Sequence, residues 1–206
     1  MAPTPQHPTT LTDRARALAA GTLTRIATAL HRAGVHPDML TAAGLALVGV
    51  AAVFIGRGEF ITAVIVLLLA LPLDALDGAV ARVMQRKNRF GALLDSTLDR
   101  YADAFLFVSL GYYFAIRGSA DLLLVSAAAL IGSYGVSYVR ARAEGLGVDV
   151  KIGLFSRLER LAVVIICLLI PALLPYGLWL LAIGTNFTTF QRLWYVYRVL
   201  HNREVS

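Results

Sequence analysis

Four aspartates lie close together in the sequence, at the ends of two apolar segments. Asp74 and Asp77 are three residues apart, and Asp95 and Asp99 are four residues apart. On helices, residues at these spacings share one face, so each pair points in one direction. Charged groups at membrane depth are costly and are tolerated mainly where they face a cavity, a partner or an ion. Because carboxylates offer only oxygen ligands, the four acids favour a hard divalent cation such as Mg²⁺ or Mn²⁺.

Small and basic residues accompany these acids. Gly78 and Ala81 follow Asp77 at helical spacing, and they let another backbone or a ligand phosphate come close. Arg82 lies one turn beyond Gly78 and offers a guanidinium that can grip a phosphate. A carboxylate-held metal polarises phosphoryl groups, so the chemistry indicated is displacement at phosphorus. Asp99, furthest along its helix from the intervening turn, is the candidate general base.

The composition predicts an all-α integral membrane protein. Of the 206 residues, 58% are hydrophobic and 16% are charged, whereas soluble domains carry about 25% charged residues. The formal net charge is +6. In so apolar a chain this charge indicates a membrane surface and phosphate-bearing ligands, and we expect the lipid bilayer and no nucleic acid among its partners.

The expected architecture is six transmembrane helices preceded by an N-terminal amphipathic interfacial helix. Residues 1–10 are polar and rich in Pro and Thr and are expected to be disordered. Residues 11–206 are expected to form a single membrane domain, with the interfacial helix at 11–33 and a six-helix bundle at about 39–197. The predicted spans are 39–55, 60–83, 90–116, 120–143, 158–174 and 176–197.

The distribution of basic residues predicts the orientation of the chain. The connections on one side of the predicted bundle carry most of the Arg and Lys, whereas the other side offers only Arg57 and Arg117. The positive-inside rule therefore places both termini in the cytoplasm, in a multi-pass protein of the cytoplasmic membrane. The acidic stretch surrounds a cytoplasmic turn, so the predicted active site also faces the cytoplasm.

A second group of candidate residues is basic. Arginines recur near the predicted cytoplasmic ends of the last three spans, and several guanidiniums in one pocket suit a phosphorylated acceptor. The alternative is that they only anchor the chain by the positive-inside rule. Asp103 continues the helical face of Asp99, and we expect it to support the site or to face solvent. The candidate acceptor residues are Arg140, Arg157, Arg160 and Arg192.

The acidic stretch resembles a known signature. Its pattern Asp-x2-Asp-Gly-x2-Ala-Arg-x8-Gly-x3-Asp-x3-Asp is similar to that of the CDP-alcohol phosphotransferase family. All eight fixed positions are met, at Asp74, Asp77, Gly78, Ala81, Arg82, Gly91, Asp95 and Asp99.

The resemblance implies a reaction and roles for these residues. Family members transfer a phosphoalcohol group from a CDP-linked donor to an acceptor hydroxyl and release CMP. They are commonly homodimers. Asp74, Asp77, Asp95 and Asp99 match the acids that bind two divalent ions, Mg²⁺ or alternatively Mn²⁺, and Asp99 matches the proton acceptor. Asn88 stands where relatives often have Thr or Ser near the donor phosphates. The implied donor-binding residues are Asp38, Met39, Leu40, Thr41, Gly78, Ala81, Arg82 and Asn88.

The acceptor is predicted from two further segments. Residues 137–144 and 156–160 are similar to the corresponding parts of prokaryotic phosphatidylinositol phosphate synthases, although Leu158 stands where relatives tend to have Pro. The resemblance implies CDP-diacylglycerol as the donor and inositol phosphate as the acceptor, in phospholipid biosynthesis. Glycerol 3-phosphate fits much the same charge pattern and is the alternative acceptor. The rival classes are a membrane prenyltransferase and a non-enzymatic cation transporter.

Overall fold

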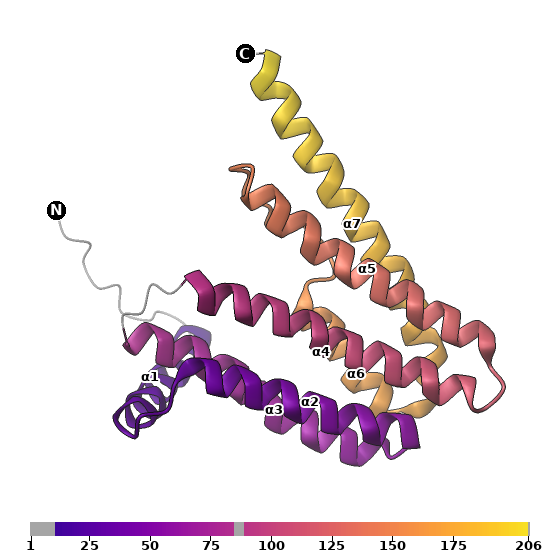
Figure 1. Ribbon diagram of the computed structural model, residues 1–206, viewed down its shortest axis with the longest axis horizontal. Coiled ribbons are helices and arrows are strands. Elements are labelled where there is room, and N and C mark those ends of the chain that lie inside the picture. The colour runs from indigo at the N-terminus through magenta and orange to yellow at the C-terminus, as the bar shows by residue number, and fades with distance from the viewer. Residues whose placement is uncertain (1–10, 85–88, 206) are drawn as a thin grey trace. The chain divides into compact units, whose positions relative to one another are not determined.

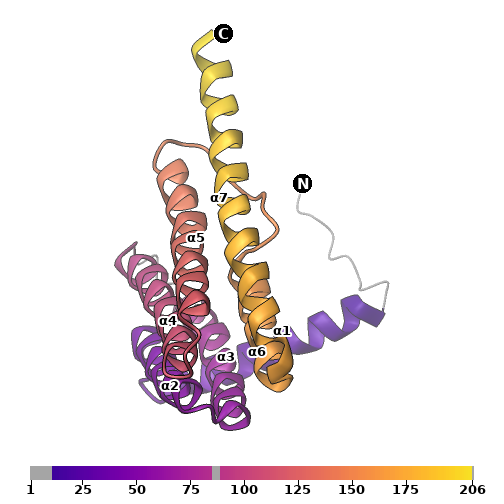
Figure 2. The same cartoon turned by 90° about the vertical axis from the view of Figure 1, so that its right-hand side faces the viewer.

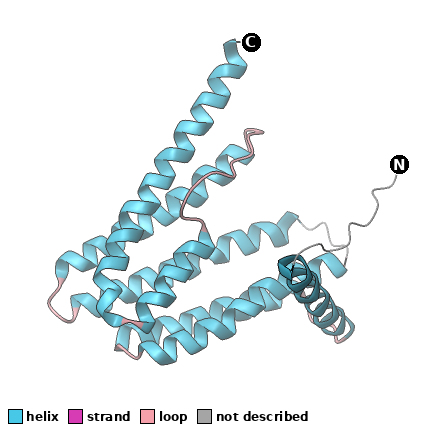
Figure 3. Cartoon of the chain, turned by 180° about the vertical axis from the view of Figure 1, so that it is seen from behind, coloured by secondary structure: helices cyan, strands magenta, loops and turns pink. Residues whose placement is uncertain are grey.

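The structure is a computed structural model that describes residues 11–84 and 89–205, with side chains described for 21–84 and 90–203. Within these ranges every regular element is a helix, as Figure 3 shows, which confirms the all-α prediction. The elements in chain order (Figure 1) are α1 (Leu11–Arg32), α2 (Pro37–Arg57), α3 (Phe60–Val83), α4 (Arg89–Ala115), α5 (Ala120–Glu144), α6 (Arg157–Leu169), the short 3₁₀ helix η1 (Pro171–Leu173) and α7 (Leu174–Val205).

Three of the described helices are long and apolar enough to cross a bilayer. These are α2, α3 and α5, of 21, 24 and 25 residues, and the protein is therefore membrane-embedded. The full set of six spans stays a prediction, as does the interfacial position of α1.

Helix α6 is shorter than the predicted segment 158–174. It ends at Leu169, and Ile170 leaves the helical region with φ −125° and ψ 82° before Pro171 opens η1. The cause is local, because the ring of a proline disfavours helical geometry in the residue before it. With 13 residues, α6 is only about 20 Å long, against about 30 Å for the hydrocarbon core.

The described chain divides into two compact units. Among the described residues, the first comprises 11–45, 69–84 and 89–98. Its core joins Ala27 of α1 and Leu40 of α2 to Ala79 and Val80 of α3. The C-terminal half of α1 therefore packs on the beginning of α2 and the end of α3, where it fixes the turn of α3 that carries the first two candidate acids. Whether residues 11–206 act as a single domain stays a prediction.

The second unit comprises the described residues 46–68 and 99–205. Within it, α5 and α7 lie side by side (Figures 1 and 2) and are tied by polar groups. Thr189 Oγ1 donates a hydrogen bond to the Gly132 carbonyl at 3.1 Å, and Asn186 Nδ2 donates to the Ala128 carbonyl at 3.0 Å. In hydrocarbon such groups need partners, and small residues such as Gly132 allow the close approach that supplies them.

The connection between α5 and α6 is packed against the second unit's helices. Val148 and Val150 are buried there beside Ala143 of α5 and Val196 of α7. Gly153 has φ +127°, and a Cβ at this position would lie 2.6 Å from Thr188 Cγ2. Only glycine fits this conformation and this approach. The connection therefore reaches the start of α6 along a fixed path, which positions the arginines of its first turn.

Candidate active site

Helices α3 and α4 carry the four candidate acids. An oxygen of Asp95 lies within 4.8 Å of an oxygen of Asp74, and Asp99 follows Asp95 one turn later on the continuous α4. Asp77 is buried, and its Oδ2 accepts a hydrogen bond from Thr41 Oγ1 at 2.9 Å. Asp77 also lies within electrostatic reach of Asp74 and Asp95. The donor set is therefore acidic and oxygen-only, and it fits a hard divalent cation.

The predicted donor-binding residues at the start of α2 have different surroundings. Leu40 is buried in the core of the first unit, whereas Met39 is 63% exposed. Asp38 Oδ2 lies 3.4 Å from His36 Nδ1. Thr41, by bonding Asp77, connects this segment directly to the acid-bearing turn of α3.

Near the end of α3, the side chain of Arg82 lies beside Gly78. Arg82 is exposed, and its Nη1 lies 3.5 Å from where a Cβ of Gly78 would be. The missing side chain at Gly78 thus leaves the guanidinium accessible from this face, and the half-buried Ala81 adds little bulk there. Asn88 lies outside the described residues.

Asp99 contacts two cations within the second unit. Arg157 Nη1 of α6 lies 2.6 Å from Asp99 Oδ1, and Arg100 Nη2 lies 3.1 Å from Asp99 Oδ2. The Asp99 side chain is 15% exposed and that of Arg157 is 30% exposed, so this ion pair is open to solvent in part. The candidate base and one candidate acceptor residue are therefore in direct contact.

One turn further along α4, a second ion pair is buried. Asp103 Oδ2 lies 2.6 Å from Arg160 Nη2, with side chains only 8% and 3% exposed. Arg160 Nη1 also donates to the Phe155 carbonyl at 3.2 Å, while its buried Nε has no hydrogen-bond partner among the described residues. Arg157 and Arg160 on α6 thus pair in order with Asp99 and Asp103 on α4.

Two more candidate arginines lie on α5 and α7. Arg192 is buried and donates from Nε to the Ile152 carbonyl at 2.8 Å and from Nη1 to the Val136 carbonyl at 2.9 Å. Arg192 therefore fastens the α5–α6 connection to α5. Arg140 is exposed and pairs with Glu144 on its own helix at 2.9 Å. Arg192 also lies within electrostatic reach of Arg140 and Arg160, each of which has an acidic partner of its own.

Sequence reasoning missed the burial of Asp103. We expected this residue to support the site or to face solvent, and the structure places it at 6% exposure against Arg160. The available signal was the matched spacing of two acids four residues apart on one helix and two arginines three residues apart on another. Each spacing gives one helical face, so two successive ion pairs can form between the helices.

A comparison with protein families bears directly on this geometry. A model described as CDP-alcohol phosphatidyltransferase matches residues 34–190, which include both acid pairs and Arg140, Arg157 and Arg160. The chain belongs to the CDP-alcohol phosphatidyltransferase family. Members of this family are transferases of phosphorus-containing groups, and the protein is therefore an enzyme of that class.

Several individual proteins and solved structures are similar to this chain. A phosphatidylinositol phosphate synthase of Streptomyces avermitilis is 39% identical, covering 88% of this chain and 80% of its own. An uncharacterized protein of Aquifex aeolicus is 44% identical, covering 78% of this chain and 81% of its own. Among solved structures, the Mycobacterium tuberculosis phosphatidylinositol phosphate synthase with CDP-DAG bound is 33% identical with a TM-score of 0.80, covering 85% of this chain and 93% of that chain. The same synthase in complex with manganese and citrate has a TM-score of 0.78, covering 85% of this chain and 88% of that chain.

Proposed function

We propose that this enzyme transfers a phosphatidyl group from CDP-diacylglycerol to a hydroxyl of inositol phosphate, with release of CMP, in phospholipid biosynthesis. The curated relatives named phosphatidylinositol phosphate synthase support this reaction, as does the related structure with CDP-DAG bound. The observation that carries it is the contact of Asp99 with Arg157, since it joins a candidate base to a candidate phosphate ligand.

The four acids form the proposed donor end of the site. Asp74, Asp77, Asp95 and Asp99 would hold two divalent ions, Mg²⁺ or Mn²⁺, which neutralise the donor diphosphate and stabilise charge on the leaving CMP. The related structure with manganese supports divalent metal use. The cytidine and diphosphate would be oriented by the residues of the family pattern, Asp38, Met39, Leu40, Thr41, Gly78, Ala81, Arg82 and Asn88.

The proposed acceptor end is the arginine group. The Arg157 guanidinium is partly exposed and contacts Asp99, the proposed base. Arg157 would therefore bind the acceptor phosphate first. Arg140 is exposed and can follow, whereas Arg160 and Arg192 are buried and hold the surrounding elements in place. A bidentate guanidinium contact fixes the phosphate in orientation as well as in position.

The proposed chemical step is a single displacement at phosphorus. Asp99 accepts the proton of the acceptor hydroxyl as the oxygen attacks the phosphorus that carries diacylglycerol. A new P–O bond forms, the phosphoanhydride bond breaks, and CMP leaves with the electron pair. Because Arg157 contacts Asp99, an acceptor phosphate bound by Arg157 brings its own hydroxyl within reach of the carboxylate.

The proposed setting of the enzyme follows from its charge pattern. We place it as a multi-pass protein of the cytoplasmic membrane, with both termini and the active site facing the cytoplasm. A homodimer is the proposed assembly. Each proposal can be checked on the intact protein, the orientation by accessibility of single introduced cysteines and the assembly by its mass in detergent.

One assay tests the proposed reaction against its alternatives. Purified protein receives CDP-diacylglycerol with Mg²⁺ and either inositol phosphate or glycerol 3-phosphate, and both CMP and the new lipid are measured. We expect a phosphatidylinositol phosphate to form. A lipid formed only with glycerol 3-phosphate would make the protein a phosphatidylglycerophosphate synthase. Absence of CMP with every acceptor would favour a prenyltransferase or a cation transporter.

A further inference from the structure

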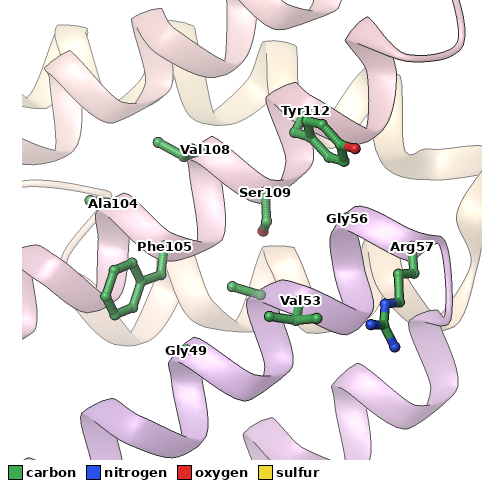
Figure 4. Close-up of a pocket in the computed structure, with 10 residues that line it drawn as sticks. Gly49, Val53, Gly56, Arg57, Ala104, Phe105, Val108, Ser109 and Tyr112 are labelled. Carbon is green, nitrogen blue, oxygen red and sulfur yellow. The ribbon is translucent and has the colours of Figure 1, made fainter.

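Helices α2 and α4 enclose a groove that the proposed reaction does not use. Its volume is about 770 Å³, which is within the range of small-molecule sites. Most of its lining is apolar, including Ala52 of α2. Figure 4 shows Val53 of α2 facing Ala104 and Val108 of α4. All of its lining residues belong to the second unit.

Two glycine–aromatic contacts frame the groove along its length. Gly49 and Gly56 are seven residues apart on α2, and a Cβ on them would lie 3.6 Å from the Phe105 ring and 3.2 Å from the Tyr112 ring. The two aromatic residues are also seven apart, on α4. This matched spacing keeps the helices close at two levels, about 10 Å apart along the axis, and leaves a narrow apolar channel between them.

Among the polar residues that line the groove, Arg57 and Tyr112 lie at one end, whereas Ser109 lies nearer the middle and donates its hydroxyl to the Leu106 carbonyl at 2.9 Å. The end with Arg57 and Tyr112 is at the end of α2 (Figure 4). Arg57 is exposed and has no ion pair or hydrogen bond to any residue that the structure describes. A second cation, Arg117, lies beside the adjoining Gly58, where its guanidinium stacks 3.8 Å over the Tyr113 ring and its Nη1 donates to the Tyr113 carbonyl at 3.1 Å. The neighbouring acid, Glu59, is exposed and does not line the groove.

This end of the groove is remote from the candidate acids along α4. Tyr112 follows Asp99 by thirteen residues of one continuous helix, which corresponds to about 20 Å. A diphosphate at Asp95 and Asp99 therefore cannot also contact the cations at the end of α2. The phosphate that Arg57 would bind belongs to a different molecule from the donor.

We propose that the groove binds one acyl chain of an anionic phospholipid, with the lipid phosphate at Arg57 and Arg117. The apolar channel is complementary to a hydrocarbon chain, and the unpaired cation at its end is complementary to a negative headgroup. Tyr112 has the mixed character typical of side chains at a membrane interface. This site is separate from the substrate sites, and the proposal does not rest on the proposed reaction.

The test is lipid retention by the intact, delipidated protein, measured by native mass spectrometry during titration with phosphatidylglycerol or phosphatidylcholine. We expect preferential retention of phosphatidylglycerol. Arg57→Ala should weaken it about five-fold, since a cation at the surface contributes about 1 kcal/mol. Val53→Trp, which fills the groove at a half-exposed position, should abolish it. The matched controls are Arg198→Ala and Leu124→Trp, both at exposed positions on α7 and α5.

Four results would overturn the proposal. Equal retention of phosphatidylglycerol and phosphatidylcholine would refute a headgroup site at Arg57. An equal loss of phosphatidylglycerol retention in Arg57→Ala and Arg198→Ala would refute it as well. A Val53→Trp variant that keeps its phosphatidylglycerol but binds CDP-diacylglycerol more weakly would assign the groove to a donor tail. A Val53→Trp variant that keeps its lipid but loses a dimeric mass would assign the groove to a second copy of the chain.

Discussion

Asp99 and Asp103 are one turn apart on α4, yet their surroundings differ in a way that separates their roles. Asp99 and its partner Arg157 are partly exposed, so either can exchange its partner for a substrate group. Asp103 and Arg160 are almost fully buried, and separating them would leave two charges without solvent. The first pair is therefore suited to chemistry and the second to holding α6 against α4.

Substituting Asp99 tests the proposed base. Asp99→Asn keeps the shape of the side chain but cannot accept the proton, so we expect CMP release to fall at least ~100-fold. Binding of CDP-diacylglycerol, measured separately, should be affected much less. Asp121→Asn, at an exposed acid in the first turn of α5, is the matched control. Near-full CMP release by Asp99→Asn would refute the assignment.

Substituting Asp103 tests the buried ion pair. Asp103→Asn leaves Arg160 charged and unpaired in the interior, which costs about 3–5 kcal/mol, and we expect a clear drop in the thermal unfolding midpoint. The double variant Asp103→Leu/Arg160→Met should recover much of the loss. Glu144→Gln breaks the exposed pair with Arg140 and should cost at most ~1 kcal/mol. Equal destabilisation by Asp103→Asn and Glu144→Gln would contradict a larger contribution of the buried ion pair to stability.

Residue patterns predicted the acids of the site better than their partners. The four aspartates could be found because each pair lies within one short segment, where spacing alone defines a shared face. The contacts of Asp99 with Arg157 and of Asp103 with Arg160 join residues 58 and 57 positions apart. Such contacts depend on which helices pack together, and a single sequence offers no direct signal for that.

At the scale of elements, apolar runs predicted where the helices lie but not where each one ends. The predicted segment at 60–83 coincides with α3, whereas the segment at 158–174 is divided at Ile170. Hydropathy is uniform across this break, and the signal for it in the sequence is Pro171, which indicates a kink near the end of the segment. The long α7, of 32 residues, likewise continues beyond the predicted 176–197 because its polar C-terminal part is still helical.

The contact of α5 with α7 leads to a prediction about Gly132. A Cβ at this position would lie 2.8 Å from the backbone nitrogen of Asn186 and closer still to Thr185 Oγ1. Gly132→Ala should therefore push the helices apart and destabilise the protein by about 1–3 kcal/mol. The measurement is the thermal unfolding midpoint of the detergent-purified protein.

The control for this variant is Gly21→Ala on α1. A Cβ at Gly21 has no atom within 4 Å, and alanine is the better helix former by up to about 1 kcal/mol. Gly21→Ala should be neutral or slightly stabilising. Equal loss in both variants would mean that the close approach at Gly132 does not limit stability.

At the scale of the whole molecule, the family and the membrane location were predictable because both rest on properties spread along the chain. The high apolar content predicted membrane helices, and eight fixed positions indicated the family, which the match over residues 34–190 confirms. The division of the described chain into two compact units was not predicted. The boundary between the units passes through α2, α3 and α4, so no linker or change in composition marks it in the sequence.

Metal dependence is the prediction that concerns the enzyme as a whole. Excess chelator should abolish transfer from CDP-diacylglycerol, and added Mg²⁺ or Mn²⁺ should restore it, because the acids offer only oxygen ligands. The measurement is CMP release before chelation, after chelation and after each addition. Ca²⁺ is the control, since it is larger and accepts looser geometry. Full activity in chelator would show that the acids serve another purpose.

The hydroxyl and amide groups of α7 have a consequence for how the chain is assembled in the membrane. Thr189 and Asn186 reach carbonyls of α5 in one register, and each also donates to a carbonyl one turn back on α7. A shift by one residue would therefore lose the bonds between the helices and keep only the local ones. The ribosome makes α5 well before α7, so the partner face of α5 stays uncovered until α7 has been synthesised. Correct pairing of α5 with α7 is thus a late event in biogenesis.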